Sequence, residues 1–403
     1  MFSTPHNEGM EPAAQIPLAM LLVFASAKIL AEIFERLGQP GIVGEILAGV
    51  LIGPHVLGWL APSEVLHTLS DLGVMFLLFR VGLEIKSSEL MKVSGIGFLV
   101  ALAGIVLPFL AGWGISLLWG EPQLESIFTG AAMVATSVGI TAQVLAARGL
   151  LNTLAARTIL AAAVIDDVLG LLVLALVSDL AHGAVNYLAL AVTAGLAIGF
   201  TVLVAHFGTR TMQRVIPRMN ARMRLVESEF ALAMTLLFAL SLLAVYAGVA
   251  AIVGAFLAGM ALSESVAQRV HEFTNGVAEL LVPFFLAGIG LHFDTTAFAN
   301  GRTLGLASAI LLAAIVSKFV GCGAGAMRMG RTDAVRVGVG MIPRGEVGMV
   351  VAQIGLRMGV MAENVYGIIV FMSLATTLVA PPLLKIAYRG EEREAPEDVI
   401  RLG

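Results

Sequence analysis

The chain has few charged residues. Lys, Arg, Asp and Glu make up only 13% of its 403 residues, whereas about a quarter is usual in soluble domains. A surface exposed to water cannot be built from so few charges. Instead, 58% of the residues belong to the apolar set AVILMFWYC, and the mean hydropathy is +0.94. Lipid must be the solvent for most of this chain, so we expect a membrane protein rather than an enzyme or a nucleic-acid-binding domain.

Cysteine is almost absent. Its single copy, Cys322, excludes an intramolecular disulfide framework and any multi-cysteine metal site. The formal net charge of −4 gives no indication of an acidic or basic partner. We therefore expect no resident cofactor.

Apolar stretches long enough to cross a bilayer recur along the chain. About 20 mostly apolar residues suffice for one spanning helix. Thirteen stretches fit this description: residues 13–36, 40–58, 66–85, 94–118, 125–147, 153–179, 184–207, 229–247, 249–266, 276–291, 303–326, 333–357 and 363–386. We predict an all-α polytopic membrane protein with about 13 transmembrane helices.

Positive charges alternate between the predicted loops. Lys and Arg collect on the cytoplasmic side of membranes. If the N-terminus lies outside, the inner loops and tail hold 20 of the 24 Lys and Arg residues, and the outer loops hold two, Arg302 and Arg357. One helix more or fewer would destroy this alternation. We predict that the N-terminus lies outside and the C-terminus in the cytoplasm.

Two adjacent acidic residues lie where lipid should surround the chain. Asp166 and Asp167 interrupt the apolar stretch 159–177. Two carboxylates at the centre of a span cost roughly 5–7 kcal/mol on an insertion scale. Such groups commonly mark ion or proton paths, although a pair satisfied by neighbouring helices would also explain them. Adjacent helix residues point about 100° apart, so one Asp can face an aqueous cavity while the other faces a neighbouring helix.

A lysine is also placed inside a predicted span. Lys318 lies ten residues before Arg328, or roughly 15 Å of helix from the predicted cytoplasmic end. A lysine side chain cannot snorkel over that distance. We therefore expect Lys318 to pair with an intramembrane carboxylate.

Two predicted spans contain residues that interrupt a helix. Residues 338–348 read Gly-Val-Gly-Met-Ile-Pro-Arg-Gly-Glu-Val-Gly, and Pro343 there removes a helical hydrogen bond. Residues 135–143 form a polar patch, Ala-Thr-Ser-Val-Gly-Ile-Thr-Ala-Gln. The two spans occupy the middle of two similar triplets, and an odd number of reversals between the triplets gives them opposite orientations. This layout predicts inverted repeats with two crossed discontinuous helices, an architecture of secondary transporters.

Five motifs now identify a family. They are residues 72–84, 135–141, 164–170, 283–291 and 343–348. In this order they resemble the second branch of the monovalent cation:proton antiporters. That branch includes NapA-type bacterial sodium/proton antiporters and glutathione-gated potassium efflux systems. The resemblance covers nearly the whole chain.

The resemblance implies an architecture and a location. It suggests a homodimer in the bacterial cytoplasmic (inner) membrane, in which a core domain moves against a dimerisation domain by an elevator mechanism. Residues 1–93 and 183–302 would belong to the dimerisation domain. The core would comprise residues 94–182 and 303–388, and residues 389–403 would form a short cytoplasmic tail.

The resemblance also suggests roles for individual residues. Asp167 would be the shared carrier of cation and proton, and Asp166 would pair with Lys318 when no cation is bound. The Na⁺ site at Asp166 and Asp167 would be lined by Thr136 and Ser137. Arg344 and Glu346 occupy the break in the second repeat, where the motif gives them no defined role. Potassium efflux relatives usually carry Gln before the essential Asp, so Asp166 favours Na⁺ or Li⁺ over K⁺.

These residues predict Na⁺/H⁺ exchange that is electrogenic. Oxygen ligands such as Asp and Thr suit small hard cations, and burial disfavours a carboxylate with no bound cation or proton. A K⁺/H⁺ antiporter remains an alternative, as does a sodium-coupled organic-anion transporter of similar fold. A channel would not need Lys318, and an intramembrane aspartyl protease would hold its two carboxylates on separate helices. The sequence leaves open the ion preference, the proton stoichiometry and the pH range.

Overall fold

The computed structural model describes residues 12–37, 39–181, 187–220, 228–293 and 301–389. Within these ranges all regular structure is helical. The elements are α1 (Pro12–Arg36), α2 (Gly41–Ile52), α3 (Glu64–Glu84), α4 (Ser87–Leu118), α5 (Gln123–Ala132), α6 (Val138–Ala147), α7 (Leu154–Ala181), α8 (Tyr187–Asn220), α9 (Ser228–Tyr246), α10 (Ala251–Leu262), α11 (Gln268–Leu291), α12 (Gly301–Gly325), the 3₁₀ turn η2 (Met327–Met329), α13 (Arg331–Gly340), α14 (Glu346–Arg357) and α15 (Glu363–Ala387).

The prediction of a multi-span helical protein is confirmed. Among the described residues, nine helices are long and apolar enough to cross a membrane, and shorter apolar helices accompany them. Each of the thirteen predicted stretches coincides with one helix or, at residues 125–147 and 333–357, with two helices separated by a break. The number of crossings and the orientation in the membrane remain predictions.

Four predicted boundaries were wrong by six residues or more. α4 begins at Ser87, before the stretch 94–118, and α8 continues to Asn220, beyond the stretch 184–207. The other two have local explanations. The stretch 40–58 contains α2, which ends at Ile52, because Pro54 lacks the N–H that would continue the helix. The stretch 276–291 is covered by α11, which begins eight residues earlier at Gln268. Its first turns are too polar to meet a hydropathy criterion, but they are helical nonetheless.

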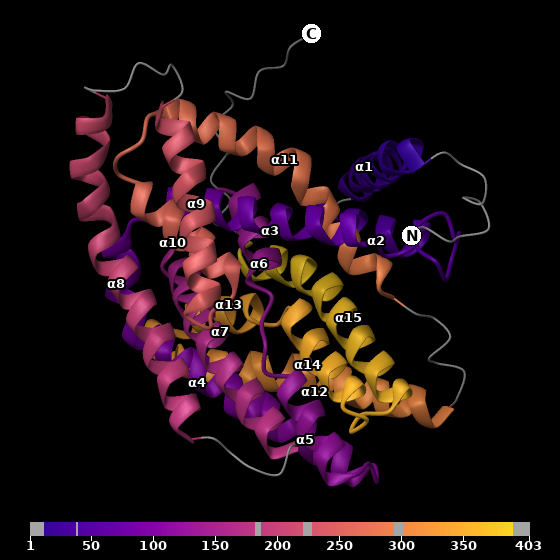
Figure 1. Ribbon diagram of the computed structural model, residues 1–403. Coiled ribbons are helices and arrows are strands. Elements are labelled where there is room, and N and C mark those ends of the chain that lie inside the picture. Colours follow the sequence, from indigo (N-terminus) through magenta and orange to yellow (C-terminus); the bar gives the residue numbers. More distant parts are fainter. Residues whose placement is uncertain (1–11, 38, 182–186, 221–227, 294–300, 390–403) are drawn as a thin grey trace.

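The helices pack into two bundles that share little contact (Figure 1). One bundle contains α4–α7 and α12–α15, and we call it bundle A. The other contains α1–α3 and α8–α11, and we call it bundle B. Packing between the bundles is confined mainly to α3 against α6, α7 against α8, and α2 against α15. In Figure 1 bundle A fills the lower part of the view, while α1–α3, α10 and α11 lie above it.

Small residues set the close approach of α3 and α10 within bundle B. A Cβ atom on Gly82 would lie 2.2 Å from the carbonyl oxygen of Phe256, and one on Gly259 would lie 2.1 Å from that of Phe79. No side chain fits at such distances, so the two backbones touch directly. Close helix contact of this kind is how helices associate in lipid.

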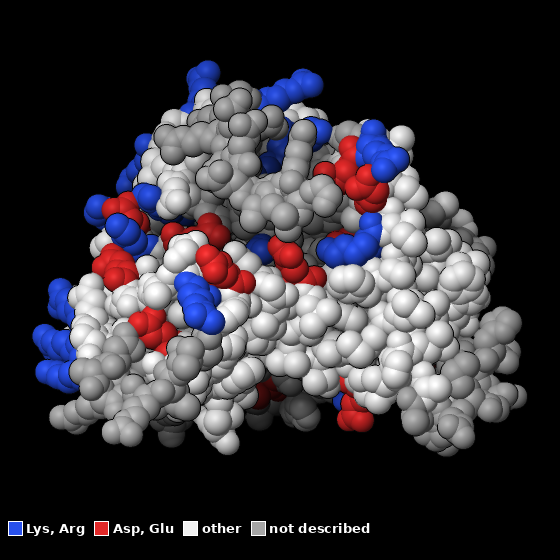
Figure 2. Space-filling view, turned by 90° about the horizontal axis from the view of Figure 1, so that it is seen from above, with Lys and Arg blue, Asp and Glu red and all other residues white. Residues whose placement is uncertain are grey.

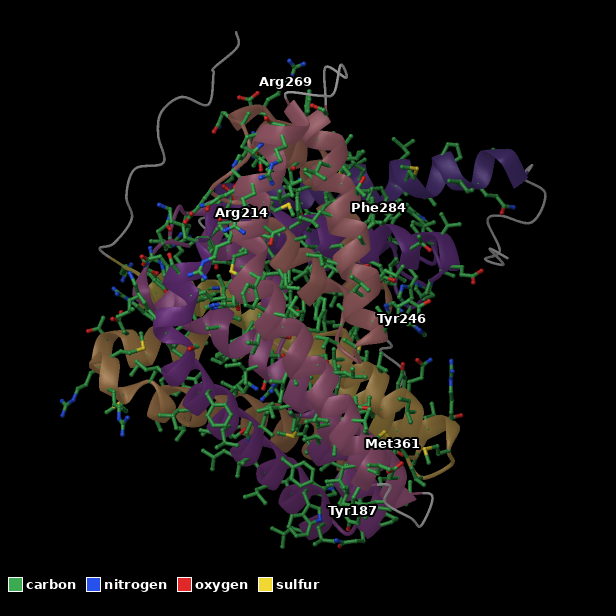
Figure 3. The ribbon with its side chains drawn as sticks, turned by 60° about the vertical axis from the view of Figure 1, so that its left-hand side comes forward. Tyr187, Arg214, Tyr246, Arg269, Phe284 and Met361 are labelled. Carbon is green, nitrogen blue, oxygen red and sulfur yellow. The ribbon has the colours of Figure 1, made fainter. Side chains whose placement is uncertain are left out.

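Charged side chains are distributed unevenly. In Figure 2 they gather on the upper and left parts of the face, and an uncharged expanse covers the right. Figure 3 shows Arg214 and Arg269 toward one end of the molecule and Tyr187 and Met361 toward the other. The alternation of positive charge in the sequence predicts this separation. Which end faces the cytoplasm remains a prediction.

Candidate functional site

Two helix breaks meet inside bundle A. The first separates α5 from α6 at residues 133–137, and the second separates α13 from α14 at residues 341–345. The backbone N–H of Ser137 donates to the carbonyl oxygen of Pro343 at 2.9 Å. The hydroxyl of Thr141 donates to the carbonyl of Gly340 at 2.6 Å. Backbone groups at both breaks thus find hydrogen-bond partners across the junction, as an interrupted helix within a membrane requires.

A glycine makes this meeting possible. A Cβ atom on Gly345 would lie 2.6 Å from the Cβ of Ser137 and 2.7 Å from its Oγ. Both atoms belong to a residue held in place by its own backbone hydrogen bond. The sequence Pro343-Arg344-Gly345 thus combines a residue that ends a helix with one that lets the second break lie against the first.

Arg344 binds the end of the first half-helix. Its side chain is completely buried. Nη1 donates to the carbonyl oxygens of Val134 at 3.0 Å and Ala135 at 3.2 Å, and Nη2 donates to that of Ala314 at 3.2 Å. The carbonyl end of a helix carries partial negative charge. The guanidinium neutralises that charge at the point where α5 stops.

Lys318 and Asp166 form a buried pair beside Arg344. Lys318 Nζ lies 3.3 Å from Asp166 Oδ2, and the side chains are 0% and 1% exposed. The ammonium also donates to the carbonyl oxygens of Gly104 and Val134, each at 2.8 Å. The hydroxyl of Thr136 donates to Asp166 Oδ2 at 2.5 Å. Asp166 is thereby held by a cation and a hydroxyl from two other elements, α12 and the first break.

Asp167 points elsewhere. It is less buried than Asp166, and it lines two small cavities of about 10 Å³ each, which is room for about one water-sized particle. One cavity is bounded by both breaks through Thr136, Ser137 and Gly345, and by Val74 of α3. The other lies between α7, α3 and α10. The geometry thus separates the two aspartates, one toward a neighbouring helix and one toward a cavity.

The structure brings together most of the residues singled out in the sequence. Asp166, Lys318 and Thr136 make direct contacts, and Ser137 lines the cavity that Asp167 faces. Glu346 begins α14, and its side chain lies outside the described residues.

Sequence reasoning missed the residues that hold the second break. The hydroxyl of Thr377 donates to the carbonyl of Arg344 at 2.8 Å, and the N–H of Arg344 donates to Thr376 Oγ1 at 3.1 Å. Both threonines lie on α15 and are buried. A pair of adjacent threonines within the apolar stretch 363–386 was the available signal. The carbonyl of Gly104 gave no signal, because backbone acceptors leave no trace in a sequence.

Comparison with known proteins places this geometry in a family. Residues 21–389 match the family described as sodium/hydrogen exchanger, transmembrane. The chain is 33% identical to the Na⁺/H⁺–K⁺ antiporter GerN of Bacillus cereus, with 92% of this chain and 96% of that protein covered. It is also 33% identical to the high-affinity Na⁺/H⁺ antiporter NhaS3 of Synechocystis, with 96% and 93% covered.

A solved structure shares the fold. The sodium proton antiporter MjNhaP1 of Methanocaldococcus jannaschii superposes with a TM-score of 0.71 at 18% identity, covering 94% of this chain and 97% of that one. This likeness shows that the two proteins share a fold. The family match and the relatives that are similar over most of the chain confirm the predicted antiporter family: the chain belongs to the transmembrane sodium/hydrogen exchangers.

Proposed function

We propose that this protein exchanges Na⁺ or Li⁺ for H⁺, and that Asp167 is the group that carries either ion. The proposal rests on the different surroundings of the two adjacent aspartates. Asp166 is neutralised by Lys318 at 3.3 Å, while Asp167 faces small cavities at the junction of the two breaks. An intramembrane carboxylate beside interrupted helices is where transporters of this kind bind ions.

The cavity supports competition between cation and proton. At about 10 Å³ it has room for about one water-sized particle. Asp167, Thr136 and Ser137 are among the residues that line it, and their oxygen atoms are of the kind that suits a small hard cation. A single carboxylate in so small a space can bind a cation or a proton, but not both, and this exclusion couples the two fluxes.

The same size argues against the organic-anion alternative. Neither cavity at Asp167 could hold an organic anion, and Asp167 would repel one. The K⁺ alternative is closer, because the relative GerN is named a Na⁺/H⁺–K⁺ antiporter. Asp166, the residue before the proposed carrier Asp167, favours Na⁺ and Li⁺ over K⁺.

The buried charge of Lys318 supports electrogenic exchange. When a cation draws Asp166 toward it, Lys318 loses the carboxylate that neutralises its charge. An unneutralised ammonium in a protein interior is disfavoured, so release of its proton would add to the proton displaced from Asp167. Two protons would then cross for each Na⁺, and the cycle would move net charge.

The two-bundle packing supports an elevator mechanism. All the site contacts described so far, apart from the cavity walls of α3 and α10, lie within bundle A. Bundle A could therefore carry the ion past bundle B as one body. We propose that bundle B forms a homodimer in the bacterial cytoplasmic membrane. Its α8 exposes large apolar side chains, including Leu203 at 60% and Phe207 at 54%.

Transport in proteoliposomes tests the proposal. Purified protein is reconstituted with a pH-sensitive dye inside, and Na⁺, Li⁺, K⁺ or choline chloride is supplied outside in turn. We expect proton movement with Na⁺ and Li⁺ and little with K⁺ or choline. Equal responses to K⁺ and Na⁺ would favour the K⁺/H⁺ alternative, and cation flux with no proton movement would indicate a channel.

A further inference from the structure

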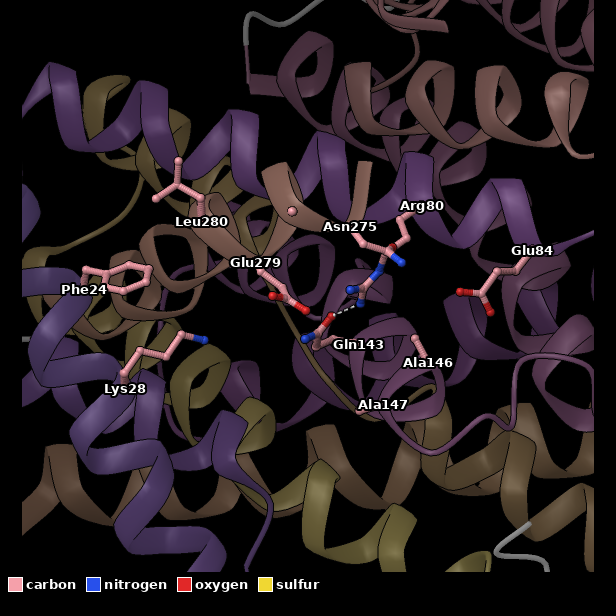
Figure 4. Close-up of a pocket in the computed structure, with 11 residues that line it drawn as sticks. Phe24, Lys28, Arg80, Glu84, Gln143, Ala146, Ala147, Asn275, Glu279 and Leu280 are labelled. Atoms are coloured by element: carbon pink, nitrogen blue, oxygen red, sulfur yellow. Dashed lines mark hydrogen bonds between the residues drawn. The ribbon is translucent and has the colours of Figure 1, made fainter. Parts of the chain in front are cut away.

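A large polar cavity lies between the two bundles and is not part of the site described above (Figure 4). Its volume is about 690 Å³, and its walls come from α1, α3 and α11 of bundle B and from α6 of bundle A. We call it the vestibule. Four polar side chains within it concern us here: Arg80, Glu84, Gln143 and Glu279.

One hydrogen bond crosses the vestibule from one bundle to the other. Arg80 Nη2, on α3, donates to Gln143 Oε1, on α6, at 2.9 Å. The dashed line in Figure 4 marks this bond. A guanidinium gives a stronger hydrogen bond than a neutral donor does, and both residues are partly buried. The bond therefore stabilises this relative position of the two bundles.

Arg80 has other partners on its own bundle. The carboxylates of Glu84, one turn along α3, and Glu279, on α11, both act electrostatically on it. In Figure 4 the guanidinium lies between these two side chains. If α6 moved away with Gln143, Arg80 would keep two compensating negative charges. Breaking the bond would therefore avoid the cost of leaving a partly buried charge without compensation.

The bond lies close to the ion site. Gln143 is four residues after Gly139, which lines the cavity at Asp167, so the rise along α6 between them is about 6 Å. On α3, Val74 lines that same cavity, six residues before Arg80. The two helices that bound the ion cavity thus also carry the two partners of the bond. A displacement of α6 along α3 would therefore change both the ion cavity and the Arg80–Gln143 hydrogen bond.

We propose that Arg80 and Gln143 form a latch that holds the vestibule-open conformation and must release in each transport cycle. The proposal rests on the proposed exchange function and adds two positioning residues to it. The proposal predicts that a stronger bond between residues 80 and 143 slows transport turnover. The slowing should require both partners of the bond.

The substitution Gln143→Glu tests this response. It replaces the amide with a carboxylate and turns the hydrogen bond into an ion pair across the moving interface. We expect sodium-driven proton turnover at saturating Na⁺ to fall about tenfold, equivalent to about 1.4 kcal/mol in the barrier. The double variant Arg80→Gln, Gln143→Glu has no ion pair, and its turnover should return to within about twofold of the parent value.

The double variant separates a latch from a merely structural role. If Gln143→Glu only disturbed local packing, removing Arg80 would not restore turnover, because the same glutamate would remain on α6. No recovery in the double variant would overturn the proposal, as would unchanged turnover in Gln143→Glu. Gln143→Ala is the matched control: it removes the bond without adding charge, and its turnover should not show the tenfold loss.

A second readout does not depend on transport. A cysteine at Ala146, which lines the vestibule on α6, reports how often the vestibule is open to an impermeant thiol reagent. The native Cys322 is buried, and the parent protein measures its background. We expect Gln143→Ala to label about twofold more slowly than Gln143→Glu. Equal rates would overturn the latch. An absence of Na⁺-dependent proton flux in the parent would instead overturn the proposed function while leaving this measurement intact.

Discussion

Removing the charge of Lys318 should destabilise the protein unless Asp166 is neutralised with it. Lys318 Nζ contacts two carbonyl oxygens at 2.8 Å and the Asp166 carboxylate at 3.3 Å, with no solvent exposure. In Lys318→Gln an amide can still donate to the carbonyls, but Asp166 loses its paired ammonium and keeps the hydrogen bond from Thr136 and the electrostatic influence of Arg344. Breaking a buried ion pair by removing one partner costs about 3–5 kcal/mol. This is a large part of a typical stability of about 5–15 kcal/mol.

The double variant Lys318→Gln, Asp166→Asn removes both charges and is the matched control. We expect it to recover most of the stability lost in Lys318→Gln, because no unpaired buried charge remains. Thermal unfolding of the purified protein in detergent, followed by tryptophan fluorescence and by retention on size exclusion, measures both variants. If Lys318→Gln alone unfolds at the same temperature as the parent, the pair is not the charged contact that its geometry indicates.

The same variant tests charge coupling. Exchange that survives in Lys318→Gln should be electroneutral, because the second proton has lost its carrier. Sodium-driven proton flux in proteoliposomes, with the membrane potential set by K⁺ and valinomycin, measures this. Exchange by the parent should be faster when the imposed potential favours positive charge moving in the direction of the protons. Exchange by Lys318→Gln should not depend on the potential. A parent protein that ignores it as well would refute the two-proton mechanism.

Three further predictions follow from other parts of the structure. Gly345→Ala would bring a methyl group within 2.6 Å of Ser137, so it should separate the two breaks and abolish exchange; Gly301→Ala, where no atom lies within 4 Å, is the control and should retain exchange. A Cβ on Gly139 would lie 3.2 Å from Val74 Cγ2, so cysteines at these two positions should form a disulfide on oxidation that stops exchange until it is reduced. Transport that persists in the cross-linked protein would contradict movement of bundle A past bundle B. A cysteine at Asn220, in a Cys322→Ser background, should resist impermeant thiol reagents added outside intact cells, and ready labelling would reverse the predicted orientation.

Features that depend on local chemistry could be predicted from the sequence. Pro343 between glycines indicated a break, and the structure has one at residues 341–345. Asp166 and Asp167 were predicted to point apart because helix geometry requires it, and their partners do differ. Lys318 was expected to meet a carboxylate because a lysine deep in a span has few other ways to be neutralised.

Features that depend on backbone contacts between distant segments could not be predicted. Arg344 binds carbonyl oxygens at Val134 and Ala135, more than two hundred residues away. Every residue supplies a carbonyl, so no pattern in the sequence distinguishes the ones at a helix end. The Arg80–Gln143 bond could not be predicted either, because the sequence does not show that these residues belong to different bundles and meet between them. The early start of α11 at Gln268 was missed because its first turns are polar.

The variant Asp167→Asn tests whether Asp167 carries both ions. The measurement is sodium-driven proton flux in proteoliposomes containing Asp167→Asn, compared with the parent and with Asp179→Asn. The control removes a carboxylate from the same helix, about 18 Å further along α7. We expect Asp167→Asn to fold normally but to show no cation-dependent proton flux, while Asp179→Asn exchanges as the parent does. Near-normal exchange by folded Asp167→Asn would mean that another group carries the ions.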